Sequence, residues 1–284
     1  MSDEGLIAGR YRLGRLIGVS GMGMVYRARD MLSARNVAIK LIAQALAADE
    51  LALRQFRREG ALYACLCHPN IVAGLGRGYD ELSRRHFIVM ELVDGDDAVK
   101  LARTGRPLPV ADVVEIVART CDALTHAHRH GIVHGDVAPA NILVRRADGL
   151  VKLTDFGLAR MRWSARAGGR TRPRGTPRYL APEVAEGYSA TPLSDLYSLA
   201  AVAHDLIATN APRVACADRS TVELDALTEQ RSPLAALRPD VPGPVAAAIA
   251  RALENDPRER QSSVEDFRSA LCGGCDESFT SIPA

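Results

Sequence analysis

The chain has no run of apolar residues long enough to span a membrane. It is 47% hydrophobic and 25% charged, but charges interrupt its alanine-rich stretches before the roughly 18–20 residues that a bilayer requires. The first residues, MSDEGLIAGRYRLG, are acidic where a signal peptide is basic, and no apolar segment follows them. We therefore expect no membrane partner, no targeting segment and a cytoplasmic location.

An excess of charge of one sign is also missing. The chain has 36 Lys and Arg residues against 34 Asp and Glu, a net charge of +2. A net charge this close to zero is no argument for a nucleic-acid partner, and we expect none. The composition is that of a folded protein. At 284 residues the chain is longer than an average domain but short for two independent ones, so we expect a single domain over 1–284.

The cysteines form no obvious metal framework. The chain has six of them, at positions 65, 67, 121, 216, 272 and 275. Cys272-Gly-Gly-Cys275 has the spacing of a redox or zinc motif, but structural zinc takes four ligands and no second pair lies nearby. A chain of this size needs no disulfides. We expect reduced thiols and no metal in the tail.

Apolar spacing predicts a β-rich first part and a helical second part. Alternation over 11–17 and 37–41 predicts half-buried strands, and 87–90 is a short apolar strand. Residues 49–66 have helical spacing, and His68-Pro69 ends that helix.

The second part is predicted to contain four helices, at 110–128, 195–208, 244–255 and 263–271. Gly131 follows the first of them as a helix terminator. The predicted fold class is therefore α+β, with a β-rich lobe over 1–93, a helical lobe over 94–271 and a short tail over 272–284.

Several short motifs bear residues suited to phosphate chemistry. Gly18-Val-Ser-Gly-Met-Gly-Met-Val25 is glycine-rich, and missing side chains let backbone N–H groups approach phosphates. A flexible hairpin turn explains the same glycines equally well. The other motifs follow in order: Val37-Ala-Ile-Lys40, Glu59, His134-Gly-Asp-Val-Ala-Pro-Ala-Asn141, Asp155-Phe-Gly157 and Ala181-Pro-Glu183.

Together these motifs resemble those of bacterial serine/threonine protein kinases of the eukaryotic-like (Hanks) type, from Tyr11 to about Leu271. The resemblance implies a bilobal protein-kinase fold that uses ATP and Mg²⁺. Lys40 would hold the α- and β-phosphates, oriented by an ion pair with Glu59. Asp136 would orient the acceptor hydroxyl and accept its proton. Asn141 and Asp155 would bind the metal.

The resemblance also assigns the remaining nucleotide contacts. Gly18, Ser20, Gly21 and Gly23 would cover the phosphates. Met90 would be the gatekeeper, Glu91 and Val93 would offer backbone groups to adenine, and Val25, Ala38 and Leu143 would sandwich the ring.

Three further matches have structural or platform roles in this family. Glu183 would pair with Arg260, Asp195 would cap the backbone of the catalytic loop, and Thr176 resembles a threonine typical of serine/threonine kinases. The histidines at 126, 128 and 130 share a helix, and we interpret them as structural because no third metal ligand is evident on their face.

The catalytic loop departs from the family pattern HRDLKPxN. Gly135 replaces an arginine that normally reads a phosphate on the activation segment. Ala138 replaces the lysine that contacts the γ-phosphate, and Ala140 supplies no substitute cation. A cation near the charge that develops in the transition state can raise the rate by orders of magnitude. The sequence therefore does not determine how fast the chain would transfer phosphate.

The activation segment, 158–180, is strongly basic. It has no acid and seven arginines, at 160, 162, 166, 170, 172, 174 and 178. Charge runs are usually solvated loops; the alternative is a clamp for an acidic substrate or a phosphosite.

Three functions remain from the sequence. The first is an active serine/threonine protein kinase with a protein substrate, possibly acidic near the acceptor. The second is an attenuated or silent kinase that acts as a nucleotide-binding interaction module. The third is a small-molecule phosphotransferase, whose catalytic loop also has the pattern HGDxxxxN. The motifs at 37–40, 155–157 and 175–183 favour a protein kinase over the third.

Overall fold

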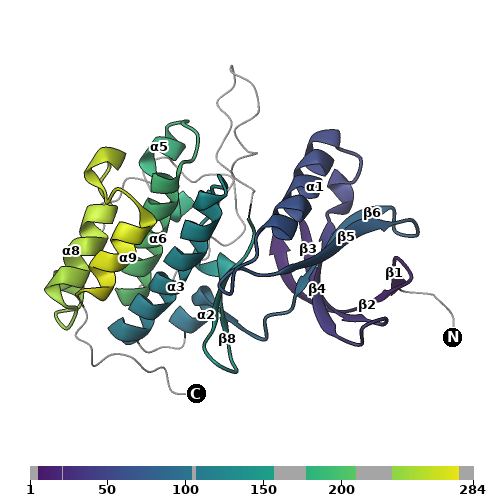
Figure 1. Cartoon of the computed structure of the whole chain (residues 1–284), viewed down its shortest axis with the longest axis horizontal. Coiled ribbons are helices and arrows are strands. Elements are labelled where there is room, and N and C mark those ends of the chain that lie inside the picture. Colours follow the sequence, from purple (N-terminus) through teal and green to yellow (C-terminus); the bar gives the residue numbers. More distant parts are fainter. Residues whose placement is uncertain (1–5, 21, 104–106, 157–176, 209–231, 275–284) are drawn as a thin grey trace. The chain divides into compact units, whose positions relative to one another are not determined.

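The computed structural model describes residues 6–20, 22–103, 107–156, 177–208 and 232–274. The chain divides into two compact units, unit 1 over residues 1–93 and unit 2 over residues 94–284. Figure 1 shows unit 1 as mostly strands and unit 2 as mostly helices, the α+β content predicted from the sequence.

Unit 1 is built on a six-stranded antiparallel sheet with the order β1-β2-β3-β4-β6-β5. The strands are β1 (Leu6–Ile7), β2 (Tyr11–Ser20), β3 (Gly23–Asp30), β4 (Asn36–Ile42), β5 (Gly74–Asp80) and β6 (Arg85–Glu91). A 3-10 turn, η1 (Gln44–Leu46), follows β4. The strands predicted at 11–17, 37–41 and 87–90 are confirmed; β5 was not predicted, since three glycines interrupt its pattern.

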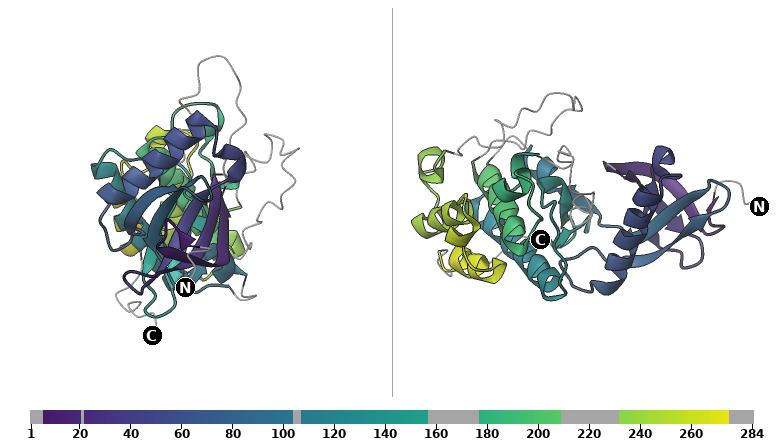
Figure 2. Two further views of the ribbon diagram at one scale, coloured as in Figure 1. Left: turned by 90° about the vertical axis from the view of Figure 1, so that its right-hand side faces the viewer. Right: turned by 90° about the horizontal axis from the view of Figure 1, so that it is seen from above.

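One helix, α1 (Glu50–Cys65), lies against this sheet (Figure 2) and packs on β5 and β6. Asp49 caps it by accepting a hydrogen bond from the Ala52 amide. The helix predicted over 49–66 is confirmed. The opposite face of the sheet carries a buried apolar cluster that includes Ile39 and Val89. Side chains alternate along a strand, so one face of the central strands packs on α1 and the other face packs in this cluster.

Unit 2 contains a small antiparallel sheet of β7 (Gly95–Asp97), β8 (Ile142–Arg145) and β9 (Val151–Leu153). Its helices are α2 (Ala98–Ala102), α3 (Val110–Arg129), α5 (Pro182–Ala185), α6 (Pro192–Ile207), α7 (Leu234–Leu237), α8 (Gly243–Ala252) and α9 (Val264–Cys272). The 3-10 turns are η2 (Pro139–Asn141), η3 (Pro177–Tyr179) and η5 (Pro257–Glu259). The four predicted helices correspond to α3, α6, α8 and α9.

Helix α6 is the centre of unit 2, where it packs against α3, α8, α9 and η3. Nearly all its residues are buried, because its sequence is apolar around the whole circumference. A capping box between Thr191 and Ser194, with Pro192 in the first turn, sets where it begins. Among the described residues no helix is long and apolar enough to cross a membrane.

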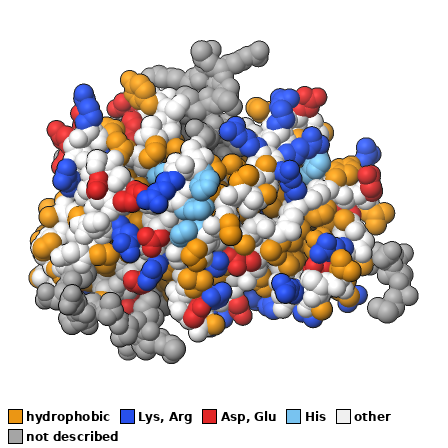
Figure 3. All heavy atoms as spheres, viewed as in Figure 1, with side chains coloured by type: hydrophobic (Ala, Val, Ile, Leu, Met, Phe, Trp, Pro, Cys, Tyr) orange, Lys and Arg blue, Asp and Glu red, His pale blue; other side chains and the backbone are white. Residues whose placement is uncertain are grey.

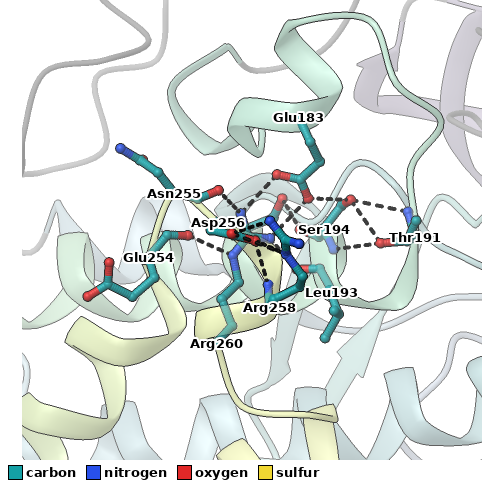
Figure 4. Close-up of polar contacts among 10 residues, drawn as sticks. Glu183, Thr191, Leu193, Ser194, Glu254, Asn255, Asp256, Arg258 and Arg260 are labelled. Carbon is teal, nitrogen blue, oxygen red and sulfur yellow. Dashed lines mark hydrogen bonds and ion pairs between the residues drawn. The ribbon is translucent and has the colours of Figure 1, made fainter.

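The buried Arg260 fastens η5 to α5 (Figure 4). Its guanidinium donates to both carboxylate oxygens of Glu183, at 3.0 and 2.8 Å. The same group donates to the backbone carbonyls of Leu193, Glu254 and Asn255. The ion pair expected between Glu183 and Arg260 is confirmed.

The Glu183 carboxylate is held in its charged form. Burial raises its pKa, but hydrogen bonds from Arg260, from its own backbone and from Ser194 outweigh burial, so the pKa lies below its ordinary value. A lowered folded-state pKa means that this contribution to stability is complete above the unfolded-state pKa and is lost as pH falls through the folded-state value.

We predict that Arg260→Ala destabilises the protein by about 3 kcal/mol, because it leaves the charged and largely buried Glu183 carboxylate, 15% exposed, without its partner. Urea unfolding, with the shift in midpoint as readout, measures the loss. The control is Arg258→Ala, which removes an arginine whose side chain is 90% exposed and leaves the midpoint in place. Equal midpoints for both variants would contradict the role given to Arg260.

Candidate active site

In unit 1 a lysine and a glutamate form a buried ion pair. Lys40 Nζ lies 2.7 Å from Glu59 Oε1, and the side chains are 0% and 1% exposed. Lys40 comes from β4 and Glu59 from α1, so the pair joins the helix to the sheet. The ion pair expected from the resemblance is thus present. A buried charge pair is costly to desolvate, which favours a functional reason for its position.

The register of the sheet places most of the predicted nucleotide-binding residues on one face. Val25 lies opposite Gly18 and Lys40, and Ala38 lies opposite Met90. Because directly opposed residues project to the same side and side chains alternate along a strand, these side chains share the face that carries Lys40. The apolar cluster occupies the other face.

The glycine-rich motif forms the β2–β3 hairpin, in which Ser20 lies opposite Gly23 and its hydroxyl donates to the Gly23 carbonyl at 3.3 Å. A side chain at Gly23 would place its Cβ 2.1 Å from the Leu41 carbonyl oxygen. This glycine is therefore required by the approach of β4, whatever else the hairpin does. Gly21 lies outside the described residues.

The predicted adenine-contacting residues follow at the end of β6. Met90 is buried. Glu91 is fixed to Ala73, since its amide donates to the Ala73 carbonyl at 2.9 Å and its carboxylate accepts from the Ala73 amide at 2.8 Å. Val93 is the last residue of unit 1 and is half-buried. Leu143 belongs to unit 2, on β8.

In unit 2 the catalytic-loop candidate is held by Asp195 of α6. This carboxylate is fully buried and accepts from the amides of His134 at 2.8 Å and Gly135 at 2.6 Å. It also lies 2.8 Å from His128 Nε2. The capping role expected for Asp195 is confirmed, and the histidine partner was not foreseen.

His134 joins this loop to the segment that carries Asp155. Its Nε2 lies 2.9 Å from the Thr154 carbonyl and its Nδ1 accepts from the Asp136 amide at 3.2 Å. Because a carbonyl can only accept, the ring is the neutral tautomer with hydrogen on Nε2. The ring also packs edge-on against Phe156 at 4.8 Å.

The two metal-ligand candidates are oriented within the same unit. The Asn141 side-chain NH₂ donates to the Asp136 carbonyl at 2.8 Å, which leaves the amide oxygen to face elsewhere. The Asn141 carbonyl accepts from the Thr154 amide at 3.0 Å. Asp155 has a φ of 61°, a left-handed conformation that a residue other than glycine adopts at a cost. Asp136 itself is half-buried.

The two departures from the family pattern sit differently in the structure. Gly135 has a φ of 68°, where any residue with a side chain costs about 1–2 kcal/mol. The glycine therefore relieves strain at a point where the backbone must present its amide to Asp195. Ala138 is only 2% exposed and precedes η2.

One of the seven arginines of the basic segment is described, and it has a defined partner. Arg178 donates from two nitrogens to the buried Asp205 of α6, at 2.5 and 3.0 Å. This arginine anchors η3, a role that the charge run did not indicate. The other six, with Gly157 and Thr176, lie outside the described residues.

The histidines and cysteines considered as metal ligands do not form a metal site among the described residues. Within the described part of the chain, no three His, Cys, Asp or Glu side chains lie close enough to hold a metal ion. His126 and His130 stack at 4.5 Å. Four cysteines are described and all are free thiols, namely Cys65, Cys67, Cys121 and Cys272.

Comparison with known proteins agrees with these arrangements. The model of the protein kinase domain family matches residues 11–271. The chain belongs to the protein kinase domain family. Within it, the resemblance to bacterial Hanks-type serine/threonine kinases is confirmed by the relatives that follow.

Serine/threonine-protein kinase PknB of Mycobacterium leprae is 35% identical over 93% of this chain and 43% of its own length. Serine/threonine-protein kinase PknA of Mycobacterium tuberculosis is 36% identical over 93% of this chain and 61% of its own. The crystal structure of the Mycobacterium tuberculosis PknI kinase domain has a TM-score of 0.73 and 32% identity, and covers 97% of this chain and 100% of that one. The chain thus spans about half the length of these two curated relatives.

We predict that Asp195→Ala loosens the catalytic loop. The change leaves two buried amides without their acceptor, at about 1–3 kcal/mol each, and exchange of the His134 and Gly135 amide hydrogens should accelerate first. Hydrogen-exchange mass spectrometry of peptides covering 130–141 measures this effect. Asp148→Ala, which removes an exposed carboxylate, is the control; unchanged exchange in Asp195→Ala would refute the capping role.

Proposed function

We propose that this chain is an ATP- and Mg²⁺-dependent serine/threonine protein kinase that transfers the γ-phosphate to a protein hydroxyl. The observation that carries the proposal is the buried Lys40–Glu59 pair. A lysine buried in this way is a fixed cation on the sheet face that also carries Gly18, Val25 and Ala38. That combination suits a nucleotide triphosphate, with the charge at the phosphates and small apolar side chains at the base.

The metal-ligand candidates have donors that suit Mg²⁺, which prefers oxygen ligands and retains waters. Asn141 offers its amide oxygen because its NH₂ is engaged with Asp136, and Asp155 offers a carboxylate. Bound there, the ion would neutralise charge on the phosphates. The hydrogen bond from the Thr154 amide to the Asn141 carbonyl joins the segment that carries Asp155 to Asn141.

Asp136 is the group that orients the acceptor hydroxyl and takes its proton. Its backbone is held on both sides, by the His134 ring at the amide and by Asn141 at the carbonyl. Such fixation is what catalysis by positioning requires.

The protein substrate is expected to be acidic near its acceptor, given the arginines of 160–174. The free thiols suit a reducing compartment, so we place the reaction in the cytoplasm.

A second candidate function is favoured by Ala138. This position carries no cation and is buried, so the lysine expected at the γ-phosphate is absent. A chain that binds nucleotide but transfers phosphate slowly could act as an interaction module.

Phosphoryl transfer tests the proposal directly. The protein is incubated with Mg²⁺ and γ-labelled ATP, alone and with a generic acceptor protein, and phosphosites are mapped by mass spectrometry. Wild type should label serine and threonine. Asp136→Asn and Lys40→Met should each abolish labelling. Asp136 is half-buried, so Asp136→Asn should keep the wild-type circular dichroism. Lys40→Met leaves the buried Glu59 without its partner, so it should also lower the unfolding midpoint, and it is assayed at a temperature where its circular dichroism matches that of wild type. Labelling that persists in Asp136→Asn would mean that another group orients the hydroxyl.

We predict that Ala138→Lys raises the transfer rate. Removal of one transition-state donor costs about 10²–10³ in rate in other enzymes, so restoring a cation should recover part of that factor. Initial rates under saturating ATP measure it, with Ala138→Met as the control for side-chain size at a buried position. An active wild type that gains nothing from Ala138→Lys would show that another residue supplies the charge; a silent wild type that becomes active would establish the second candidate.

A further inference from the structure

Three arginines of unit 1 stand together on one face of its sheet. Arg12 lies on β2, and Arg27 and Arg29 lie on β3. The register places Arg12 directly opposite Arg29, and it places Arg27 directly opposite Ala38 of β4. Because opposed residues project to the same side and side chains alternate along a strand, the three arginine side chains share the face that carries Ala38. They are called the arginine patch below.

The arginine patch lies at the surface. Arg12 and Arg29 are exposed, and Arg27 is half-buried. Helix α1 packs on β5 and β6, whereas the sheet order puts β2 and β3 next to β1, towards the other edge. Figure 3 shows Lys and Arg side chains at the surface of the part of unit 1 that contains β2. The patch is therefore accessible to another molecule.

The charges of the arginine patch are not neutralised by nearby acids. Arg10, which precedes β2, pairs with the buried Asp30 at 2.7 Å. By contrast, no residue in the described part of the chain forms an ion pair or a hydrogen bond with a side chain of the patch. Like charges directly opposite each other destabilise a strand pair, so Arg12 and Arg29 repel each other across β2 and β3. An anion bound between them would remove that repulsion.

The spacing of the arginine patch matches that of an extended acidic chain. Alternate residues of a strand are roughly 6.6 Å apart, so Arg27 and Arg29 repeat at the interval at which an extended peptide presents every second side chain. Arg12 adds a second guanidinium opposite Arg29. A guanidinium can bind a carboxylate through two parallel hydrogen bonds. Carboxylates at alternate positions of an extended segment would therefore meet the arginines one by one.

The surroundings of the patch favour an acidic protein segment over a nucleic acid. Single-stranded nucleic acids are held by aromatic side chains that stack on the bases as well as by charge. The neighbours of the patch on this face are Val25, Asn36 and Ala38, and none of them is aromatic.

We propose that the arginine patch binds an extended acidic segment of a partner protein, with aspartate or glutamate at alternate positions. One carboxylate lies between Arg12 and Arg29, and the next acid along the segment pairs with Arg27. The proposal is independent of the chain's own transfer activity, because it concerns binding alone.

The test uses the full chain and two labelled peptides of identical composition, made only of glutamate and threonine. The glutamates alternate with threonine in one peptide and form a single block in the other. Fluorescence polarisation should show that the alternating peptide binds about threefold more tightly. Arg12→Ala and Arg29→Ala should each weaken its binding about threefold, as the loss of an exposed ion pair does. Arg58→Ala removes an exposed arginine of α1 and should change the affinity by less than about 1.5-fold.

Equal affinity for the two peptides, or no binding at millimolar concentration, would overturn the proposal. So would an equal loss of affinity in Arg58→Ala, which would indicate diffuse attraction to any positive surface. Tighter binding of oligouridylate than of the alternating peptide would assign the patch to nucleic acid instead. Displacement of the peptide by Mg²⁺–ATP would assign the three arginines to the nucleotide site and would also contradict the proposal.

Discussion

The catalytic-loop candidate of unit 2 depends on one buried carboxylate, that of Asp195. Asp195 projects from the apolar helix α6 and accepts hydrogen bonds from the His134 and Gly135 amides. A buried charge in an apolar helix is tolerated only when its hydrogen bonds are satisfied. Here the groups that satisfy it are the backbone of the loop that carries Asp136. The carboxylate can therefore stay buried only while the loop keeps the conformation that brings these amides to it.

Unit 1 depends on the Lys40–Glu59 pair, which fixes a cation on the side of the sheet where we propose that nucleotide binds. The two departures from the family pattern, Gly135 and Ala138, leave both of these supports intact. Gly135 keeps the amide that Asp195 needs and eases a left-handed backbone, whereas Ala138 removes a charge without loosening the loop. Under the proposed function, the chain keeps the groups that would position the reactants and lacks one cation that would stabilise developing charge. This combination fits an enzyme that is slowed rather than unfolded.

Elements could be predicted from the sequence where the spacing of apolar residues matches the buried face of a helix or strand. Helices such as 110–128 follow apolar periodicity and were predicted nearly to the residue. The strands 142–145 and 151–153 were not, because they are too short for alternation to register. The Lys40–Glu59 contact was expected from family resemblance, since no local spacing links a strand to a helix. The pairing of Arg178 with Asp205 was missed because a charge run gives no sign of which member finds a buried partner.

We propose that binding of Mg²⁺–ATP depends on Lys40 and also on Asp155. Calorimetric titration of ATP into wild type, Lys40→Met and Asp155→Asn, each with and without Mg²⁺, tests it most directly. We expect both substitutions to weaken binding of Mg²⁺–ATP, and only Lys40→Met to weaken binding of ATP alone. Equal affinity of all three proteins for Mg²⁺–ATP, or no binding by wild type, would contradict it.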